Sequence, residues 1–180
     1  MATRRIQFIP WAVSFEIFGE AVSWIKAKKF YHVVHYSKIK NPVLYFTDDG
    51  EIYVHGHGDA GDPEISPGKG TLGSDLNYRE VADRLIKTGL KKDFHGKIKL
   101  YSCMSGVGRS GPNTSFANLF ANYMRSQGYN NCTYHGYIGY LSGKRTENGY
   151  KDTALIDGVD KKGEDKYVVI GRASEHRVEF

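Results

Sequence analysis

Two histidines and a cysteine are the residues of this 180-residue chain whose types and spacing best suit chemistry. His55 and His57 lie in a glycine-rich turn, VHGHGD, that follows the apolar run Ile52 to Val54. Histidine titrates nearest neutral pH, so it carries protons or binds metals, and a neighbouring glycine lets a ligand approach closely. Cys103 follows a second short strand-like run, Lys97 to Tyr101. The pattern predicts two strands that each end in a chemically reactive turn.

The segments that would position these turns alternate between strand and helix patterns. The sequence therefore predicts an α/β fold with a mostly parallel central sheet flanked by helices. Because sites in such sheets form at the carboxyl ends of the strands, the two turns are expected at one edge. The stretch between them is long enough for a loop and one crossover helix. Strands are expected at 30–36, 43–46, 51–54, 97–101, 132–138 and 167–170, and helices at 15–28, 78–90 and 115–127.

The chain length favours a single domain covering residues 1–180, with a core at 30–143 and a tail or hairpin at 144–180. Pro10 argues against a central strand at 4–13, which we expect to be an edge strand or a lead-in. Residues 59–77 and 142–165 are rich in glycine and polar residues, and the first of these stretches is expected to form an active-site or substrate loop.

A cysteine and a histidine at one sheet edge suit nucleophilic catalysis. His57 could accept the proton of Cys103, and the N–H groups of Gly58 and Cys103 could polarise a carbonyl as an oxyanion hole. The alternative is that Cys103 is a small buried apolar residue without a chemical role. The adjoining His-Gly turn favours catalysis.

The order of these motifs resembles the caspase-fold cysteine peptidases of clan CD, which include caspases, gingipains and clostripain. Over residues 43–143, VHGHGD, LNYREVADRLIKTGL, IKLYSCMSG, SFANLFANYM and CTYHGYIG look most similar to the autoprocessing cysteine-peptidase domains of bacterial toxins. The order of these motifs also resembles that in effector modules of polymorphic toxin systems. The resemblance implies a caspase-like three-layer sandwich and cysteine protease activity, a hydrolase function, in a bacterial toxin or secreted effector that contributes to virulence.

The resemblance also assigns roles to particular residues. It implies that His57 is the catalytic histidine, Cys103 the nucleophile and Gly58 an oxyanion contributor, and it leaves His55 a weaker candidate. Some relatives add an upstream acidic residue that orients the histidine, and Glu16, Asp48 and Asp49 all stay open for that role. The toxin domains bind inositol hexakisphosphate through basic residues, for which the tail offers Lys144, Arg145, Lys161 and Lys162.

Two other functions compete with the peptidase. His55, His57 and Asp59 alternate along the chain and resemble the opening of metallo-β-lactamase-fold hydrolases, which would make a metal-dependent hydrolase. That motif normally continues with another histidine, where this chain has Ala60. The third reading is a catalytically inactive caspase-fold effector that binds a partner protein, for which its 13 tyrosines suit an adaptable surface.

The composition of the chain limits the classes of molecule that the protein is expected to bind. The formal net charge is +5 with 25 basic and 20 acidic residues interspersed, which makes no nucleic-acid stripe. The expected partners are a protein or peptide substrate, including a protein of a host or competitor cell. No run approaches the length of a membrane span, and the N-terminal stretch lacks a cleavage site for a signal peptide. We expect a protein made in the cytoplasm, and export by a machinery that requires no signal peptide stays open.

Overall fold

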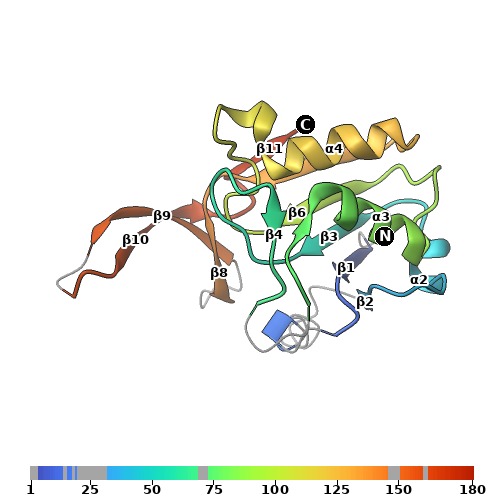
Figure 1. Cartoon of the computed structure of the whole chain (residues 1–180), viewed down its shortest axis with the longest axis horizontal. Coiled ribbons are helices and arrows are strands. Elements are labelled where there is room, and N and C mark those ends of the chain that lie inside the picture. The colour runs from blue at the N-terminus through green and yellow to red at the C-terminus, as the bar shows by residue number, and fades with distance from the viewer. Residues whose placement is uncertain are drawn as a thin grey trace.

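A computed structural model describes residues 4–13, 16–17, 19, 32–68, 73–145, 151–159 and 162–180. Its main feature is a six-stranded sheet with the order β11-β7-β6-β3-β1-β2 (Figure 1). Neighbouring strands are parallel except β11, which pairs with β7 in the antiparallel direction. The strands are β1 (Arg5–Ile9), β2 (His32–His35), β3 (Glu51–His55), β6 (Lys97–Tyr101), β7 (Thr133–Tyr137) and β11 (Arg177–Glu179). The predicted α/β class with a mostly parallel sheet is confirmed.

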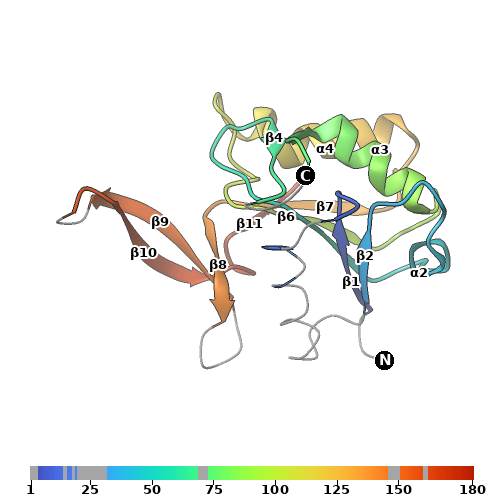
Figure 2. The ribbon, with the colours of Figure 1, turned by 60° about the horizontal axis from the view of Figure 1, so that its bottom comes forward.

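Two helices cover one face of this sheet (Figures 1 and 2). They are α3 (Tyr78–Thr88) and α4 (Phe116–Ser126), each close to its predicted range. Asn77 begins α3 with a complete capping box, and Gly89 ends it at φ 123°, a backbone conformation that glycine adopts readily. Ser115 caps α4 through the N–H of Asn118. The helix predicted at 15–28 lies outside the described residues except at 16, 17 and 19.

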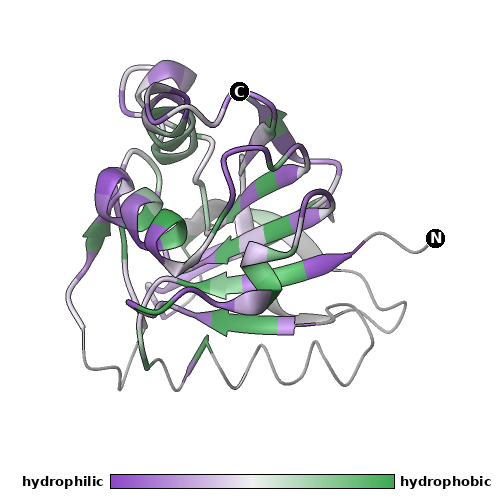
Figure 3. Ribbon diagram, turned by 90° about the vertical axis from the view of Figure 1, so that its right-hand side faces the viewer, coloured by the Kyte–Doolittle hydropathy of each residue, from purple (hydrophilic) through white to green (hydrophobic). Residues whose placement is uncertain are grey.

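Strand alternation and register determine which side chains form the core between the helices and the sheet. Ile52 pairs with Ile98, and Val54 pairs with Leu100, so their side chains form rows on the helix side. These residues belong to one buried apolar cluster with Leu85 of α3 and residues of α4. Figure 3 shows hydrophobic segments along the strands and on the helix sides turned toward them.

A second, three-stranded antiparallel sheet projects beside the carboxyl ends of β6 and β7 (Figure 1). Its strands are β8 (Tyr140–Arg145), β9 (Lys151–Val159) and β10 (Asp165–Arg172). We call this sheet the arm. A short hairpin of β4 (Glu64–Ile65) and β5 (Leu76–Asn77) lies within the predicted long loop. The described residues also form the short helix α2 (Pro42–Tyr45) and a 3₁₀ turn at Pro112–Thr114.

Several local expectations were wrong. Residues 43–46 belong to a helix and not to a strand, because Asn41 caps the turn and Pro42 supplies its first residue. β1 lies inside the sheet between β3 and β2, because Pro10 comes one residue after the strand ends and removes no ladder bond. The polar stretch 142–165 contains most of β8 and β9. Part of the charged tail forms β11, which joins the central sheet.

Candidate functional site

The register of the sheet brings the two reactive turns together. β3 ends at His55 and β6 ends at Tyr101, and these two residues are paired partners in adjacent parallel strands. His57 and Cys103 each follow two residues later. The two turns therefore leave the same edge of the sheet side by side, at the carboxyl ends of the strands, where sites in α/β folds form.

Gly58 packs directly against the turn that carries Cys103. A Cβ atom at Gly58 would lie 3.0 Å from the Cys103 carbonyl oxygen and 3.3 Å from Ser102 Cβ and Oγ. A side chain here would push the two turns apart, so the close approach depends on glycine. The N–H of Gly58 donates no hydrogen bond to a described residue. The turn thus brings an unused backbone donor next to Cys103.

The His57 backbone is fixed by a bridge to Ser66 across the turn. The His57 N–H donates to the Ser66 carbonyl at 2.9 Å, and the Ser66 N–H donates back at 2.8 Å. The side chain of His57 is 40% exposed, but its Nε2 atom is covered and lies 3.9 Å from Oε2 of Glu16. Gly68, at φ +82°, packs over this pair, since a Cβ there would lie 2.7 Å from His57 Nε2.

Glu16 is the acidic residue that the sequence left undecided among three. Asp48 instead forms an ion pair with Lys91 at 2.7 Å, near the amino ends of the strands. Asp49 is exposed in the turn just before β3 begins. Only Glu16 of the three approaches His57. No motif marks Glu16 in the sequence, because its contact with His57 is made by the fold across 41 positions.

Cys103 differs from the other cysteine in its surroundings. Cys103 is partly exposed, and its Sγ accepts a hydrogen bond from the N–H of Leu141 at 3.3 Å. Cys132 is buried, and burial raises the pKa of its thiol. A reactive thiol must be accessible, and of these two cysteines Cys103 is the partly exposed one and lies at the carboxyl edge of the sheet.

The turn at Cys103 is anchored by Ser105, which the sequence gave no reason to single out. The Ser105 hydroxyl donates to the Leu100 carbonyl at 2.7 Å and accepts from the Tyr137 N–H at 3.1 Å. Met104 adopts a left-handed conformation at φ 55°, and its N–H donates to the Gly139 carbonyl at 3.1 Å. A strained residue held by such contacts is common where backbone geometry serves a site.

The arm touches both halves of the site through its first strand. The Tyr140 hydroxyl donates to Asp59 Oδ1 at 2.7 Å, and this hydrogen bond raises the pKa of Tyr140. The next residue, Leu141, donates to Cys103. The Tyr140 ring packs edge-on against Tyr167 of β10 at 5.3 Å between centroids. Asp59 therefore connects the histidine turn to the arm.

The alternating set His55, His57 and Asp59 is not assembled as a metal site. His55 is buried on the sheet, where its Nδ1 is hydrogen-bonded to the Gln7 amide and its ring lies edge-on to Tyr101. In the part of the chain that the structure describes, no group of three or more His, Cys, Asp or Glu side chains could hold a metal ion. Residues two apart share a face only within a strand, and β3 ends at His55, so His57 and Asp59 lie beyond the part of the chain where this spacing would align them.

A small pocket of about 230 Å³ opens beside His57 and Gly58. Carboxylates dominate its lining, which includes Asp59, Asp62, Glu64 and Asp75. Of the four tail residues predicted to bind inositol hexakisphosphate, Lys161 lies outside the described residues, and only the Lys162 side chain is described. Lys162 is exposed.

Neither the models of known protein families nor the curated proteins match this sequence. Among the described residues, none of the helices has the length and apolar character needed to cross a bilayer. The protein is of the α/β class and has a mostly parallel sheet. A histidine turn and a cysteine turn meet at the carboxyl edge of this sheet.

Proposed function

We propose that this protein is a cysteine peptidase with a caspase-like three-layer fold, in which Cys103 and His57 form the catalytic dyad. The observation that carries the proposal is the contact between the two turns. Gly58 packs on the Cys103 backbone, and His57 is the residue directly before Gly58 in the chain. The resemblance in motif order points to the same pair of residues. On that resemblance the protein acts as a bacterial toxin or secreted effector on itself or on a target protein.

The proposed reaction begins with proton transfer from Cys103 to His57. Because Nε2 of His57 faces Glu16, Nδ1 is the ring nitrogen left to accept the proton. The Glu16 carboxylate would hold the ring in this tautomer and stabilise the imidazolium that forms. The Leu141 N–H would stabilise the thiolate, since it already donates to Sγ. These contacts favour a nucleophilic sulfur at neutral pH.

The thiolate then attacks the carbonyl carbon of the scissile peptide bond. The N–H groups of Gly58 and Cys103 would stabilise the negative charge that develops on the carbonyl oxygen. The Gly58 N–H donates to no other described residue. Collapse of the tetrahedral intermediate breaks the C–N bond, and His57 returns the proton to the leaving amine. Water, deprotonated by His57, hydrolyses the thioester and releases the carboxylic acid and Cys103.

Two measurements on the intact protein test the proposal. The first is hydrolysis of fluorogenic peptides with Arg, Leu or Asp before the scissile bond, together with self-cleavage of the chain. Arg is included because carboxylates line the pocket beside His57. We expect Cys103→Ala to abolish hydrolysis and His57→Ala to lower kcat by roughly 100-fold or more. Cys132→Ala, at a buried cysteine away from the site, serves as the matched control and should retain activity.

The second measurement needs no substrate. The rate at which iodoacetamide alkylates Cys103 near neutral pH should fall in His57→Ala, because the proposed acceptor of the thiol proton is then missing. Glu16→Gln should lower kcat with little change in KM, and Glu16→Asp should restore part of it. An equal rate of Cys103 alkylation in the unmodified protein and in His57→Ala would contradict the catalytic dyad. Alkylation that depends on His57 without hydrolysis of any probe would favour the inactive, partner-binding effector.

A further inference from the structure

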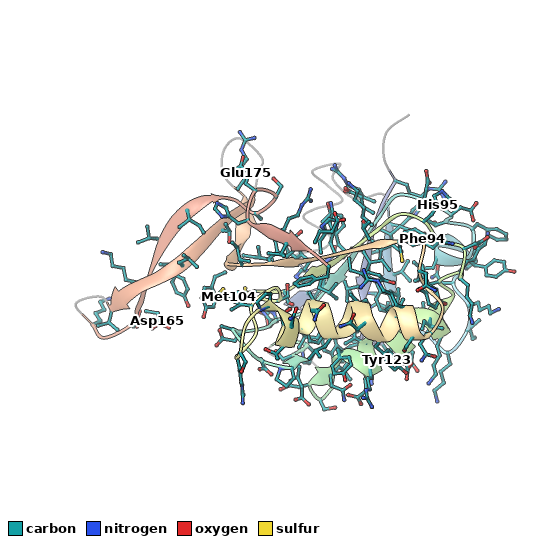
Figure 4. The ribbon with its side chains drawn as sticks, turned by 90° about the horizontal axis from the view of Figure 1, so that it is seen from above. Phe94, His95, Met104, Tyr123, Asp165 and Glu175 are labelled. Atoms are coloured by element: carbon teal, nitrogen blue, oxygen red, sulfur yellow. The ribbon has the colours of Figure 1, made fainter. Side chains whose placement is uncertain are left out.

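The loops at the amino ends of the strands lie at the opposite end of the sheet from Cys103. The loop before β3 contacts the loop before β6, since the His95 N–H donates to the Asp48 carbonyl at 2.9 Å. Figure 4 labels His95 at this end and Met104, the neighbour of Cys103, toward the arm. Figure 1 shows α2 at this same end, away from the arm. Whatever binds here leaves the candidate site uncovered.

This end exposes large apolar side chains. Ile39 is 80% exposed and Phe46 68% exposed, which makes them the most exposed large hydrophobic residues in the described part of the chain. Tyr45 is 41% exposed, and its ring lies edge-on to Phe46 at 5.1 Å between centroids. Within α2 only Leu44 is buried. The short helix therefore directs one side chain into the core and presents aromatic rings outward.

Lysine ammonium groups surround the aromatic rings. Lys40 Nζ lies 5.2 Å and Lys91 Nζ 5.6 Å from the centre of the Tyr45 ring. Lys91 also pairs with Asp48 at 2.7 Å, whereas Lys40 and Lys92 form no ion pair with a described residue. We define the lysine–aromatic surface as Ile39, Lys40, Tyr45, Phe46, Lys91 and Lys92.

A groove of about 480 Å³ runs through this surface. The charged residues that line it are Lys40, Lys91, Lys92 and Asp93, so positive charges outnumber negative ones by three to one. Tyr45 forms part of its wall. The ammonium groups of such a groove suit a phosphate-bearing group, to which they can donate charge-assisted hydrogen bonds.

We propose that the lysine–aromatic surface docks the protein on an anionic phospholipid membrane. Charge complementarity selects the occupant, because the lysines match lipid phosphates and carboxylates, each Lys near such a surface adding to the attraction. Ile39 and Phe46 are largely exposed, and apolar side chains beside lysines can insert at the boundary between headgroups and acyl chains. Protein–protein interfaces are instead depleted in lysine, which supplies three of the six residues of this surface. The proposal does not rest on the peptidase function.

Vesicle flotation with the full chain tests the docking. Vesicles of phosphatidylcholine alone are compared with vesicles in which part of it is replaced by phosphatidylserine. We expect binding to the anionic vesicles that weakens as salt is raised, because surface charges are screened. Lys92→Gln should weaken binding by about fivefold, the equivalent of one lysine near the membrane. Phe46→Ser should weaken it by about tenfold, because apolar burial is lost.

Matched controls come from the arm at the other end of the molecule. Val169→Ser removes an apolar side chain that is 60% exposed, and Lys166→Gln removes an exposed cation. Both should bind anionic vesicles as the unmodified protein does, and thermal melts should show that every variant is folded. Equal binding to neutral and anionic vesicles, or equal losses in the arm variants, would overturn the proposal. Absence of vesicle binding would overturn it too, and poly-glutamate binding lost in Lys92→Gln would then point to an acidic protein.

Discussion

The two faces of the central sheet are stabilised by different interactions, although the same strands supply both. On the face toward α3 and α4 the side chains are apolar, and they pack with the helices into one cluster. On the other face, polar and ionisable side chains alternate with them along the same strands. The register aligns Gln7, Tyr53, Lys99 and His135 in one row across β1, β3, β6 and β7.

The polar face depends on specific pairs. Lys99 is 2% exposed, and its Nζ donates to Glu51 Oε1 at 2.6 Å and to the Tyr53 hydroxyl at 2.9 Å. Arg5 donates to the other Glu51 oxygen at 3.0 Å. Burial alone would raise the pKa of Glu51, but these partners lower it to about 2, while burial lowers the pKa of Lys99 to about 8.

The difference between the faces predicts how each responds to substitution. An apolar face loses stability in proportion to the volume and area removed, and many neighbours share the loss. A polar face loses stability when one partner is removed, because the other is left buried and charged. Removing both partners together should therefore be far less harmful on the polar face than removing either one.

The largest effect is expected on the helix face. Phe120 of α4 is fully buried, stacks on Phe116 at 6.5 Å and meets the Tyr134 ring at 6.1 Å. Phe120→Ala should lower the free energy of unfolding by about 3 to 5 kcal/mol, measured by urea denaturation. The control Asn122→Ala changes an exposed residue of the same helix and should cost less than about 0.5 kcal/mol. Similar losses in the two variants would contradict the packing described here.

A somewhat smaller effect is expected from Lys99→Met on the polar face. The substitution leaves Glu51 paired with Arg5 alone, so the loss should be about 3 kcal/mol, the low end for a broken buried ion pair. The double variant Lys99→Met with Glu51→Gln should recover most of this stability, because the one charge left without its partner is then Arg5, whose side chain is 40% exposed to water. A double variant less stable than Lys99→Met would show that the two faces do not differ in this way.

The helix face was largely predictable from the sequence, and the polar face was not. α3 and α4 combine a periodic apolar pattern with the caps Asn77 and Ser115, so local signals and packing agree. α2 was mistaken for a strand because its residues after Pro42 are β-prone. The signals for a helix were the capping Asn41 and the proline at its first position. β8 and β9 were missed since the arm is built from a polar, glycine-bearing stretch.

The candidate site divides in the same manner. The two turns could be placed at one edge from the order of strands and helices, because parallel strands share the direction of their carboxyl ends. The sequence named Glu16 only as one of three candidates, and it did not single out Ser105, Tyr140 or Leu141, since all four reach the turns only through the folded chain. Side-chain types alone did not separate His55, buried beside Gln7, from His57.

The response to acid separates the two faces most clearly. Glu51 has a pKa of about 2 in the folded protein and an ordinary pKa of 4.5, so the unfolded chain binds more protons between these values. Its contribution to stability is therefore complete above pH 4.5 and is lost as the pH falls toward 2. The apolar contacts of Phe120 have no such dependence. Urea denaturation across this range should show a steeper loss in the unmodified protein and in Phe120→Ala than in the double variant at Glu51 and Lys99. Parallel pH profiles for all three would mean that the Glu51 network does not set the acid sensitivity of the fold.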